Sequence, residues 1–232
     1  MIGMFEKVNS KVVKVNLGQS GPVISRRGSM LFYAGQVTFA PHQIPGAGGA
    51  PGGGGMGAMV GSMMRSEHER TMVAPGTGEV HYGFHGLAVH VINLPQGGQV
   101  TADMSRLLGF SAGMQASIVS TQSQQAGGGG LRGALRGAAA GALTGNGMFT
   151  TQLSGVGSVV VLAHGEVMEL QVGNGPVVVD PQAFVGTVGN VQTQLQSAMS
   201  WRDAVGRGSG EAMQLQCHGQ GVVLVQASED KL

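Results

Sequence analysis

The sequence predicts an all-β fold of short strands, tight turns and glycine-rich inserts. Apolar residues make up 42% of the 232-residue chain, and many are valines and leucines in short runs bounded by glycine. Such runs are typical of buried strands. Glycine occurs 43 times, far above average usage, whereas charged residues make up only 11%. A disordered chain combines low hydrophobicity with high net charge, so this composition favours a folded chain with many turns.

The clearest strand pattern runs from Gly155 to Leu195. The motif Gly155-Val156-Gly157 is followed by the β-branched apolar run 158–163, which predicts a buried strand. Gly165 permits a sharp reversal, and residues 166–172 then alternate as a half-buried strand does. A third run, 177–179, follows. The segment therefore predicts a hairpin hinged at glycine.

The N-terminal residues 9–40 have the pattern of a strand meander. Strand-like runs at 11–15 and 23–25 flank a turn at 18–22. The stretch 26–37 has an apolar centre between Gly28 and Gly35, as expected of a hairpin strand with a tight exit.

Parts of the chain repeat one another. Four pairs of residues are separated by the same number of positions along the chain. They are Asp103 and Asp180, Gly109 and Gly186, Gln115 and Gln192, and Ile118 and Leu195. We call this separation the repeat spacing. A Gly-x-Gly motif after a strand-like run and before an apolar strand occurs three times, which assigns a structural role to Gly76, Gly78, Gly155, Gly157, Gly219 and Gly221. Three such hairpins predict three structural repeats.

We therefore expect residues 1–232 to form a single all-β domain of three pseudo-repeats. The expected boundaries are about 1–45 joined with 196–232, then 46–126, then 127–195, so that the N-terminal strands 9–40 complete the last repeat. Closure or mutual packing of the repeats would protect their strand edges.

Two inserts, 46–64 and 127–147, are dominated by glycine and alanine, and glycines recur four residues apart in both. This spacing stacks glycines on one helix face, but each interior glycine costs a helix about 1 kcal/mol relative to alanine. Flexible loops are the main interpretation. The alternative is a helix that forms only on a membrane surface or at a subunit contact. The candidate contact residues are Met56, Met59, Met63, Met64, Leu131, Arg132, Leu135 and Arg136.

Charge and cysteine content bound the partners and the compartment. With 13 basic and 12 acidic residues the formal net charge is +1, so electrostatic capture of nucleic acid is not expected. Cys217 is the only cysteine, which favours a reducing compartment. No signal peptide or membrane-spanning run is evident, so we expect a cytoplasmic protein.

No catalytic or cofactor-binding set emerges, and we expect no cofactor. Asp103 and Asp180 each precede a short segment that ends at glycine, which indicates helix-capping residues rather than a catalytic pair. The Gly-x-Gly motifs precede strands, whereas a dinucleotide-binding motif precedes a helix. The histidines do not follow a known metal motif; they are His81, His85, His90, His164 and His218. The methionines of 56–64 could bind a soft metal, but adaptable apolar contact is the commoner role.

Three motifs together resemble the altered-inheritance-of-mitochondria family. They are Arg27-Gly28-Ser29-Met30-Leu31-Phe32-Tyr33-x-Gly35, then Gly145-Asn146-Gly147-Met148-Phe149 with Gly155-x-Gly157, and finally Gly210-Glu211 leading to Gly219-x-Gly221-Val222-Val223-Leu224-Val225-Gln226. The resemblance spans nearly the whole chain. It departs from the family at Asn146, where glutamate is common.

The resemblance implies a fold similar to the trp RNA-binding attenuation protein. That fold would be β-sandwich-like repeats, in the style of a double-stranded β-helix, in a pseudo-threefold arrangement. The family carries no established catalytic residues, and kinship of fold does not transfer RNA binding. Eukaryotic members of the family are tied to the organisation of the mitochondrial inner membrane. The composition indicates a bacterial chain, so from this resemblance we take only the expectation of a scaffold close to a membrane.

The function expected from the sequence is a non-enzymatic scaffold or interaction protein. It would be a homo-oligomer, with a protein or a membrane surface contacted through the glycine-rich inserts. One alternative is a module for a small ligand or RNA, with binding near Arg26, Arg27 and Arg106. Another is a cupin-like metalloenzyme that uses His81 and His85, together with His164.

Overall fold

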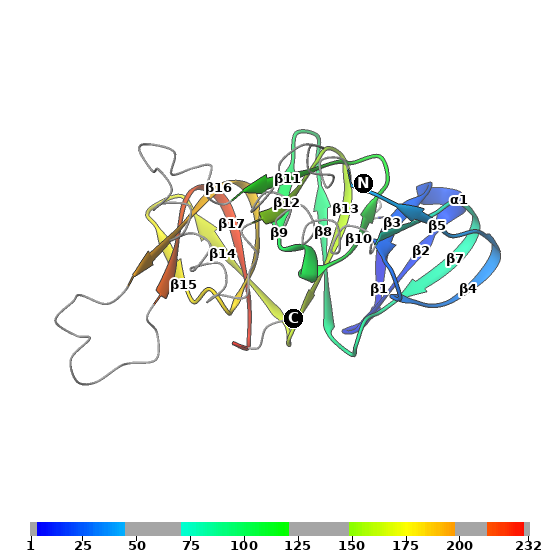
Figure 1. Ribbon diagram of the computed structural model, residues 1–232, viewed down its shortest axis with the longest axis horizontal. Coiled ribbons are helices and arrows are strands. Elements are labelled where there is room, and N and C mark those ends of the chain that lie inside the picture. The colour runs from blue at the N-terminus through cyan, green and yellow to red at the C-terminus, as the bar shows by residue number, and fades with distance from the viewer. Residues whose placement is uncertain (1–3, 45–70, 121–148, 198–212, 230–232) are drawn as a thin grey trace, which may run out of the picture.

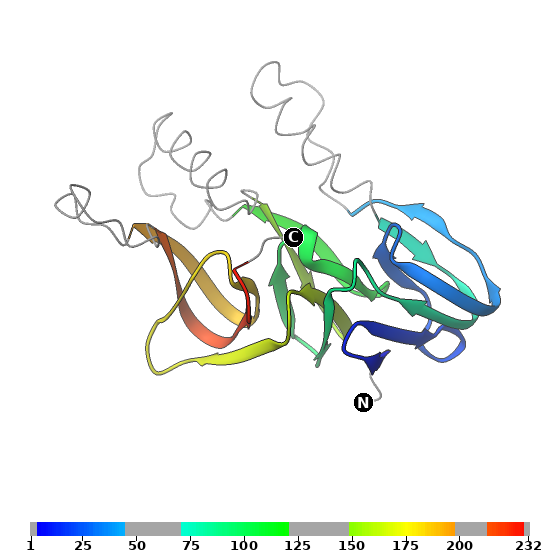
Figure 2. The same cartoon turned by 90° about the horizontal axis from the view of Figure 1, so that it is seen from below.

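A computed structural model describes residues 4–44, 71–120, 149–197 and 213–229. These residues form three antiparallel sheets that follow one another along the long axis of the molecule (Figures 1 and 2). The regular helical structure among them is limited to α1 (Leu17–Ser20) and η1 (Met104–Arg106). The all-β class predicted from the sequence is confirmed. The resemblance to the attenuation protein and the pseudo-threefold arrangement stay predictions.

The N-terminal sheet has four strands in the order β1-β2-β7-β4. Their bounds are β1 Phe5–Asn9, β2 Val12–Asn16, β4 Met30–Val37 and β7 Gly76–Tyr82. Strand β2 lies at 12–16 and β3 at 23–26, close to the strand-like runs of the sequence. The turn between them contains α1, and the side chain of Asn16 caps this helix by accepting the N–H of Gly18.

The middle sheet has six strands in the order β5-β6-β3-β10-β13-β8. Their bounds are β3 Val23–Arg26, β5 Ala40–His42, β6 Thr71–Ala74, β8 Ala88–Leu94, β10 Leu107–Ser111 and β13 Gly157–Ala163. The order of the strands in the sheets therefore differs from their order in the sequence. Strands β3 and β6 belong to the middle sheet, although β1, β2, β4 and β7 around them form the N-terminal sheet.

The C-terminal sheet has seven strands, six of them in the order β11-β12-β9-β16-β17-β14, with β15 paired to β17. Their bounds are β9 Gln99–Ala102, β11 Gln115–Ser120, β12 Phe149–Ser154, β14 Val167–Val172, β15 Val177–Val179, β16 Phe184–Ser197 and β17 Met213–Gln226. Strand β17 pairs with β14, β15 and β16. The pairing therefore differs from the expected completion of the last repeat by strands 9–40.

The uninterrupted apolar run of β13 has a physical cause. Val159, Val161 and Ala163 belong to one core cluster, which lies between the middle and C-terminal sheets. Val160 and Leu162 belong to a second cluster, which lies between the middle and N-terminal sheets. Because successive side chains of a strand point to opposite faces, a strand with a core on each side must be apolar at every position.

The first Gly-x-Gly motif begins β7, the second leads into β13, and the third lies within β17. The residues that follow each motif pair with a neighbouring strand in the same way. The residue four places after the second glycine pairs with the last residue before a β-bulge: Tyr82 with Met30, Val161 with Leu107, and Val225 with Phe184. The residue three places after it pairs with the first residue beyond the bulge: His81 with Phe32, Val160 with Gly109, and Leu224 with Gly186. The bulged residues Leu31, Leu108 and Val185 are therefore equivalent, and each lies one repeat spacing after the one before.

A turn precedes each bulge at the same spacing. In all three turns the first carbonyl accepts the N–H of the fourth residue, in the segments 26–29, 103–106 and 180–183. Asp103 accepts the N–H of Ser105 at 2.8 Å and caps η1, whereas Asp180 accepts that of Gln182 at 2.6 Å in a turn that is not helical. Gly109 and Gly186 were expected to end these turns, and that expectation is wrong. They lie inside β10 and β16, next to the bulges.

The glycines of the first and third motifs allow close contact between backbones. A Cβ added at Gly78 would overlap the carbonyl oxygen of Ala34, and one added at Gly221 would overlap that of Val188. At Gly157 the nearest atoms are those of the Ser111 side chain, at 2.8 Å, whereas Gly155 has only one neighbour, at 3.9 Å. The structural role predicted for the motif thus has a direct cause at Gly78, Gly157 and Gly221.

The strand pairs also locate the segments that fall outside the described residues. Three of them connect β5 to β6, β11 to β12, and β16 to β17, and each of these pairs is antiparallel. The predicted inserts 46–64 and 127–147 belong to the first two connections. The described strand ends that flank the three connections lie along the same side of the molecule (Figure 2).

Substitution of Gly221 by alanine should strongly destabilise the fold. The new methyl group would overlap the Val188 carbonyl, and overpacking of this kind costs about 1–3 kcal/mol. Gly175 is a matched control, because its φ of +157° resembles the +151° of Gly221 but no atom lies within 4 Å of its added Cβ. Urea denaturation should give a markedly lower midpoint for Gly221→Ala than for Gly175→Ala. Equal midpoints would contradict the close-contact role.

Candidate functional site

The outer edge of β4 is an exposed apolar surface. Among the described residues β4 ends its sheet, and the strand Met30–Val37 carries neither a charged residue nor a proline. Its exposed fractions are 39% at Met30, 52% at Leu31, 56% at Phe32 and 46% at Tyr33. Natural proteins usually protect such edges with charges, prolines or a covering segment. We call this surface, residues 30–36 of β4, the β4 edge.

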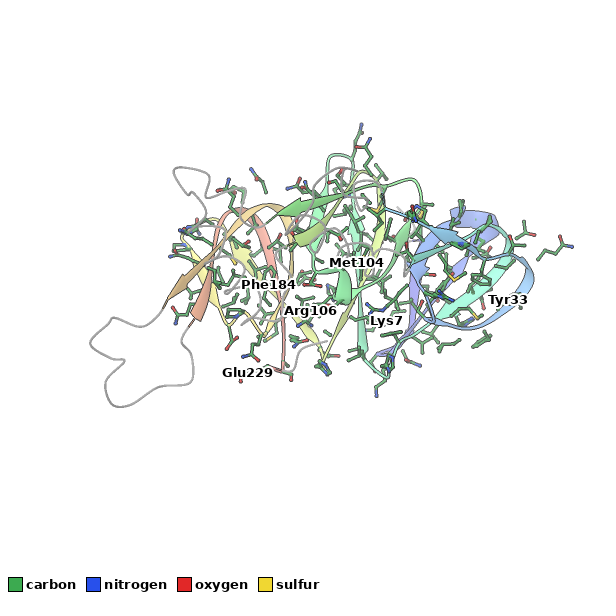
Figure 3. All side chains as sticks on the ribbon, viewed as in Figure 1. Lys7, Tyr33, Met104, Arg106, Phe184 and Glu229 are labelled. Atoms are coloured by element: carbon green, nitrogen blue, oxygen red, sulfur yellow. The ribbon has the colours of Figure 1, made fainter. Side chains whose placement is uncertain are left out.

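Two aromatic contacts hold the rings of the β4 edge in place. Phe32 stacks on His81 of the neighbouring strand, with ring centroids 4.1 Å apart. Tyr33 meets the edge of Phe39 at 5.6 Å and lies at the outer end of the molecule (Figure 3). Rings that are already fixed lose little conformational entropy when a partner covers them.

The equivalent positions of the other two hairpins are buried. The bulged residues Leu108 and Val185 are 1% and 0% exposed, against 52% for their equivalent Leu31. Phe110, which lies one repeat spacing after Tyr33, is 2% exposed. The first hairpin therefore presents to solvent the residues that the second and third hairpins bury.

The charges beside β4 are compensated. Lys14 lies 3.4 Å from the Glu6 carboxylate and 3.5 Å from that of Glu79. The hydrogen bond that Lys14 donates to Glu6, together with the charges of both carboxylates, raises the pKa of Lys14. A partner that approaches β4 thus meets apolar side chains and backbone rather than a cationic surface.

Two of the three arginines proposed as a ligand site, Arg26 and Arg106, make hydrogen bonds within the protein. The Arg26 guanidinium donates to the Ser105 carbonyl at 2.8 Å and lies 4.5 Å from the centroid of the Phe84 ring. Arg106 is only 2% exposed, and burial lowers its pKa. It donates to the Gln226 side chain at 2.6 Å and to the Gln182 carbonyl at 3.2 Å. Of the three arginines, only Arg27 is exposed.

These two arginines connect successive turns. Arg26, from the turn 26–29, reaches the carbonyls of the turn 103–106. Arg106, from that second turn, reaches the carbonyl of Gln182 in the turn 180–183 and lies near the middle of the molecule (Figure 3). The turns of neighbouring hairpins are therefore packed against one another.

The candidate metal-binding histidines do not gather. No group of three or more His, Cys, Asp or Glu side chains suited to a metal occurs within the described ranges. His81 stacks on Phe32 and lies 3.6 Å from Glu79. The backbone N–H of His164 donates instead to Gln226 at 3.0 Å.

His90 links two sheets beside a small polar depression. Its Nε2 lies 3.3 Å from Glu169 of β14, and burial lowers its pKa although Glu169 acts in the opposite direction. The depression has a volume of about 180 Å³ and is lined by Lys7, Ser10, Ala88, Val89, His90, Gly165, Glu166 and Val167. Its lining mixes both signs of charge, so it favours no single class of ligand.

The predicted contact residues of the inserts lie outside the described residues. This applies to Met56, Met59, Met63, Met64, Leu131, Arg132, Leu135 and Arg136. Sequence reasoning missed the β4 edge, because the apolar strand 30–37 resembles any buried strand. The available signal was the absence of a charged or proline residue along a strand of eight residues.

These features define an all-β protein of repeated glycine-hinged hairpins with an unprotected strand edge. The chain belongs to the mitochondrial biogenesis AIM24 family, whose model matches residues 4–228.

Among solved structures, the chain is similar to a crystal structure of a Streptococcus pyogenes protein from a structural genomics consortium. The identity is 16% and the TM-score 0.65, and the match covers 97% of this chain and 92% of that one. That likeness shows the fold alone. No curated protein matches the chain. Within the described ranges no helix is long and apolar enough to span a bilayer.

Substitution of Arg106 by methionine should destabilise the fold by about 2 kcal/mol, because a hydrogen bond from a charged group to a buried acceptor contributes about 1.5–3 kcal/mol. Gln226 and the Gln182 carbonyl would each lose a donor. The control is Arg27→Met at the exposed position, where a change within about 0.5 kcal/mol is expected. Chemical denaturation measures both. A neutral Arg106→Met would show that this arginine is not a structural link.

Proposed function

We propose that the protein is a non-enzymatic scaffold that works as an assembly of its own copies, joined through the β4 edge. The observation that carries this proposal is the contrast in burial between equivalent residues. Leu31 is 52% exposed, whereas Leu108 and Val185 are 1% and 0% exposed. A position that is core in two hairpins and solvent-exposed in the third is suited to an interface.

The β4 edge needs a partner that protects it from uncontrolled pairing. A strand edge presents unpaired N–H and C=O groups, and an uncharged apolar edge is prone to uncontrolled pairing. A specific partner removes this hazard and adds apolar burial, which is the main driving force of protein association. The compensated charges around Lys14 and the net charge of +1 present little repulsion between copies.

The glycine-rich inserts extend this proposal toward membranes. The inserts 46–64 and 127–147 belong to connections between strands that pair with each other, so the sheets do not depend on them for their pairing. We assign them contact with a membrane surface, in which the methionines and leucines enter the interface and Arg132 and Arg136 remain at the headgroups. The protein would then work in the cytoplasm, peripheral to a membrane.

Substitution of Leu31 by lysine should dissociate the assembly without unfolding the chain. A lysine on a strand edge disfavours pairing, and an exposed position tolerates it. Light scattering after gel filtration should give a multiple of the 23.5 kDa chain mass for the wild type and a lower mass for Leu31→Lys.

The matched control is Val8→Lys, since Val8 is 48% exposed on β1, the opposite edge of the same sheet. It should retain the wild-type mass. A wild-type chain that is monomeric at every concentration, or equal dissociation by both lysines, would contradict the proposal.

Deletion of 46–64 and 127–145 tests the membrane contact separately. Since each insert joins adjacent antiparallel strands, short turns in their place should leave the β core folded, with an unchanged circular dichroism spectrum. Flotation with anionic liposomes should fall several-fold relative to the intact chain. Unchanged flotation would remove the membrane role while leaving the scaffold proposal in place.

A further inference from the structure

In the second and third hairpins the bulged strand pairs with a further strand along its edge, and its bulged residue belongs to a core cluster between two sheets. In the middle sheet β3 pairs with the outer edge of β10, and in the C-terminal sheet β9 pairs with the outer edge of β16. We call β3 and β9 covering strands. Among the described residues β4, the equivalent of β10 and β16, has no covering strand.

The two covered edges have the same register. The pairs of β10 with β3 are Gly109 with Ser25, Phe110 with Ile24, and Ser111 with Val23. The pairs of β16 with β9 are Gly186 with Ala102, Thr187 with Thr101, and Val188 with Val100. Every residue of the second set lies one repeat spacing after its counterpart in the first. The junction between successive hairpins is therefore a repeated, antiparallel unit of structure.

A third strand, β15, has the spacing of a covering strand but covers no bulged strand among the described residues. Val177 lies one repeat spacing after Val100 of β9, which itself lies one repeat spacing after Val23 of β3. Like β3 and β9, β15 pairs on one side with the strand that leads into a Gly-x-Gly motif, here β17. Its other side has no strand partner within the described ranges. Val178 is accordingly 49% exposed, whereas its equivalent Ile24 is 4% exposed.

The uncovered strand and the free covering strand lie far apart in one molecule. Strand β4 lies at one end of the long axis and β15 at the other, in both views (Figures 1 and 2). A single chain in this conformation therefore cannot bring them together. One end of the molecule presents a strand without a covering strand, β4, and the other end presents a strand with the spacing of a covering strand, β15.

On the basis of the proposed function, we infer that β15 of one copy covers β4 of the next. The repeated register specifies the contacts: Tyr33 opposite Val178, Phe32 opposite Val179, and Ala34 opposite Val177. The junction between copies then has the same form as the two junctions within each chain. The occupant of the β4 edge is a second copy of this protein.

The exposed residues provide enough apolar surface to begin such a contact. A Phe or Tyr side chain buries about 200 Å² when fully covered, so Phe32 and Tyr33 each expose roughly 100 Å². With Met30 and Leu31 the total is about 400 Å², half of the ~800 Å² that each partner contributes to a stable complex. The outer backbone of β4 and the turn beside it supply further area.

The turns add complementary charge. Within the chain, each turn donates from an arginine to carbonyls of the next: Arg26 to Ser105, and Arg106 to Gln182. The same geometry places the turn 180–183 against the turn 26–29 of the next copy. There Asp180, at the position equivalent to Arg26, would meet the exposed Arg27. Opposite charges at this contact favour β15 on β4 over β4 on β4, which would bring no acidic turn to Arg27.

An interface between two different surfaces of the same chain is heterologous. Such contacts generate closed rings when the rotation between copies closes, and filaments when it does not. Each added copy buries one β4 edge and one β15 edge, and in a ring neither of these two edges is left exposed.

Cysteine cross-linking tests this register. Tyr33→Cys and Val178→Cys are made in separate chains, mixed and oxidised. Residues directly opposite in antiparallel strands have Cβ atoms about 4.5–5.5 Å apart, close to disulfide geometry. The native Cys217 is buried, which raises its pKa to about 11 and leaves it unreactive. We expect a covalent dimer in the mixture, and none from Val8→Cys mixed with Val178→Cys. Val178→Lys should lower the assembly mass as Leu31→Lys does.

Three outcomes would overturn the inference. Cross-linking of Tyr33→Cys with itself would indicate β4 paired with β4. An assembly sensitive to Leu31→Lys but not to Val178→Lys, with no mixed disulfide, would mean that another surface covers β4, and the scaffold proposal would survive. A wild-type chain that stays monomeric would remove both.

Discussion

Backbone pairing between successive hairpins is the constraint on which the rest of the structure depends. Strand β3 leaves the N-terminal part of the chain to cover β10, and β9 leaves the central part to cover β16. Because of this exchange, the middle sheet lies between two cores and β13 is apolar on both faces. The same exchange has two consequences among the described residues. Strand β4 has no strand beyond its outer edge, and β15 pairs with β17 on one side only.

The glycines act within each hairpin, and two arginines act between hairpins. Glycine at Gly78 and Gly221 lets the two strands of a hairpin approach closely, and the bulges in β10 and β16 place Leu108 and Val185 in the core. Arg26 and Arg106 then fasten one turn to the next. Residues that a motif search could assign to a phosphate or an anionic ligand are thus explained by packing, and the surface that packing leaves unexplained is the β4 edge.

Much of the fold could be predicted from the sequence, because its local signals agree with the pairing. The run 158–163 forms the buried strand β13, Asp103 caps η1, and Gly78 and Gly221 lie in close backbone contact. The first member of the repeat series was missed because Arg26 stands where the others have aspartate, so the turn geometry repeats without the residue. The exposure of Tyr33 could not be predicted, since Phe110 has the same aromatic character and is buried. What separates the two is their packing: Phe110 belongs to a core cluster between two sheets, whereas Tyr33 belongs to no core cluster of the described residues.

Hydrogen exchange measured as a function of protein concentration tests whether β15 of one copy pairs with β4 of the next. Strands β4 and β15 already pair on one side with β7 and β17, so only the amides of residues 32–34 and 177–179 that point to the other side report on the contact between copies. If β15 of one copy covers β4 of the next, these outward amides should be protected in the assembly and exchange rapidly on dilution. The amides of β10 and β16 should stay protected throughout, because their covering strands belong to the same chain. Protection of the outward amides of β4 that persists in the diluted monomer, or its absence in the assembly, would contradict pairing between copies.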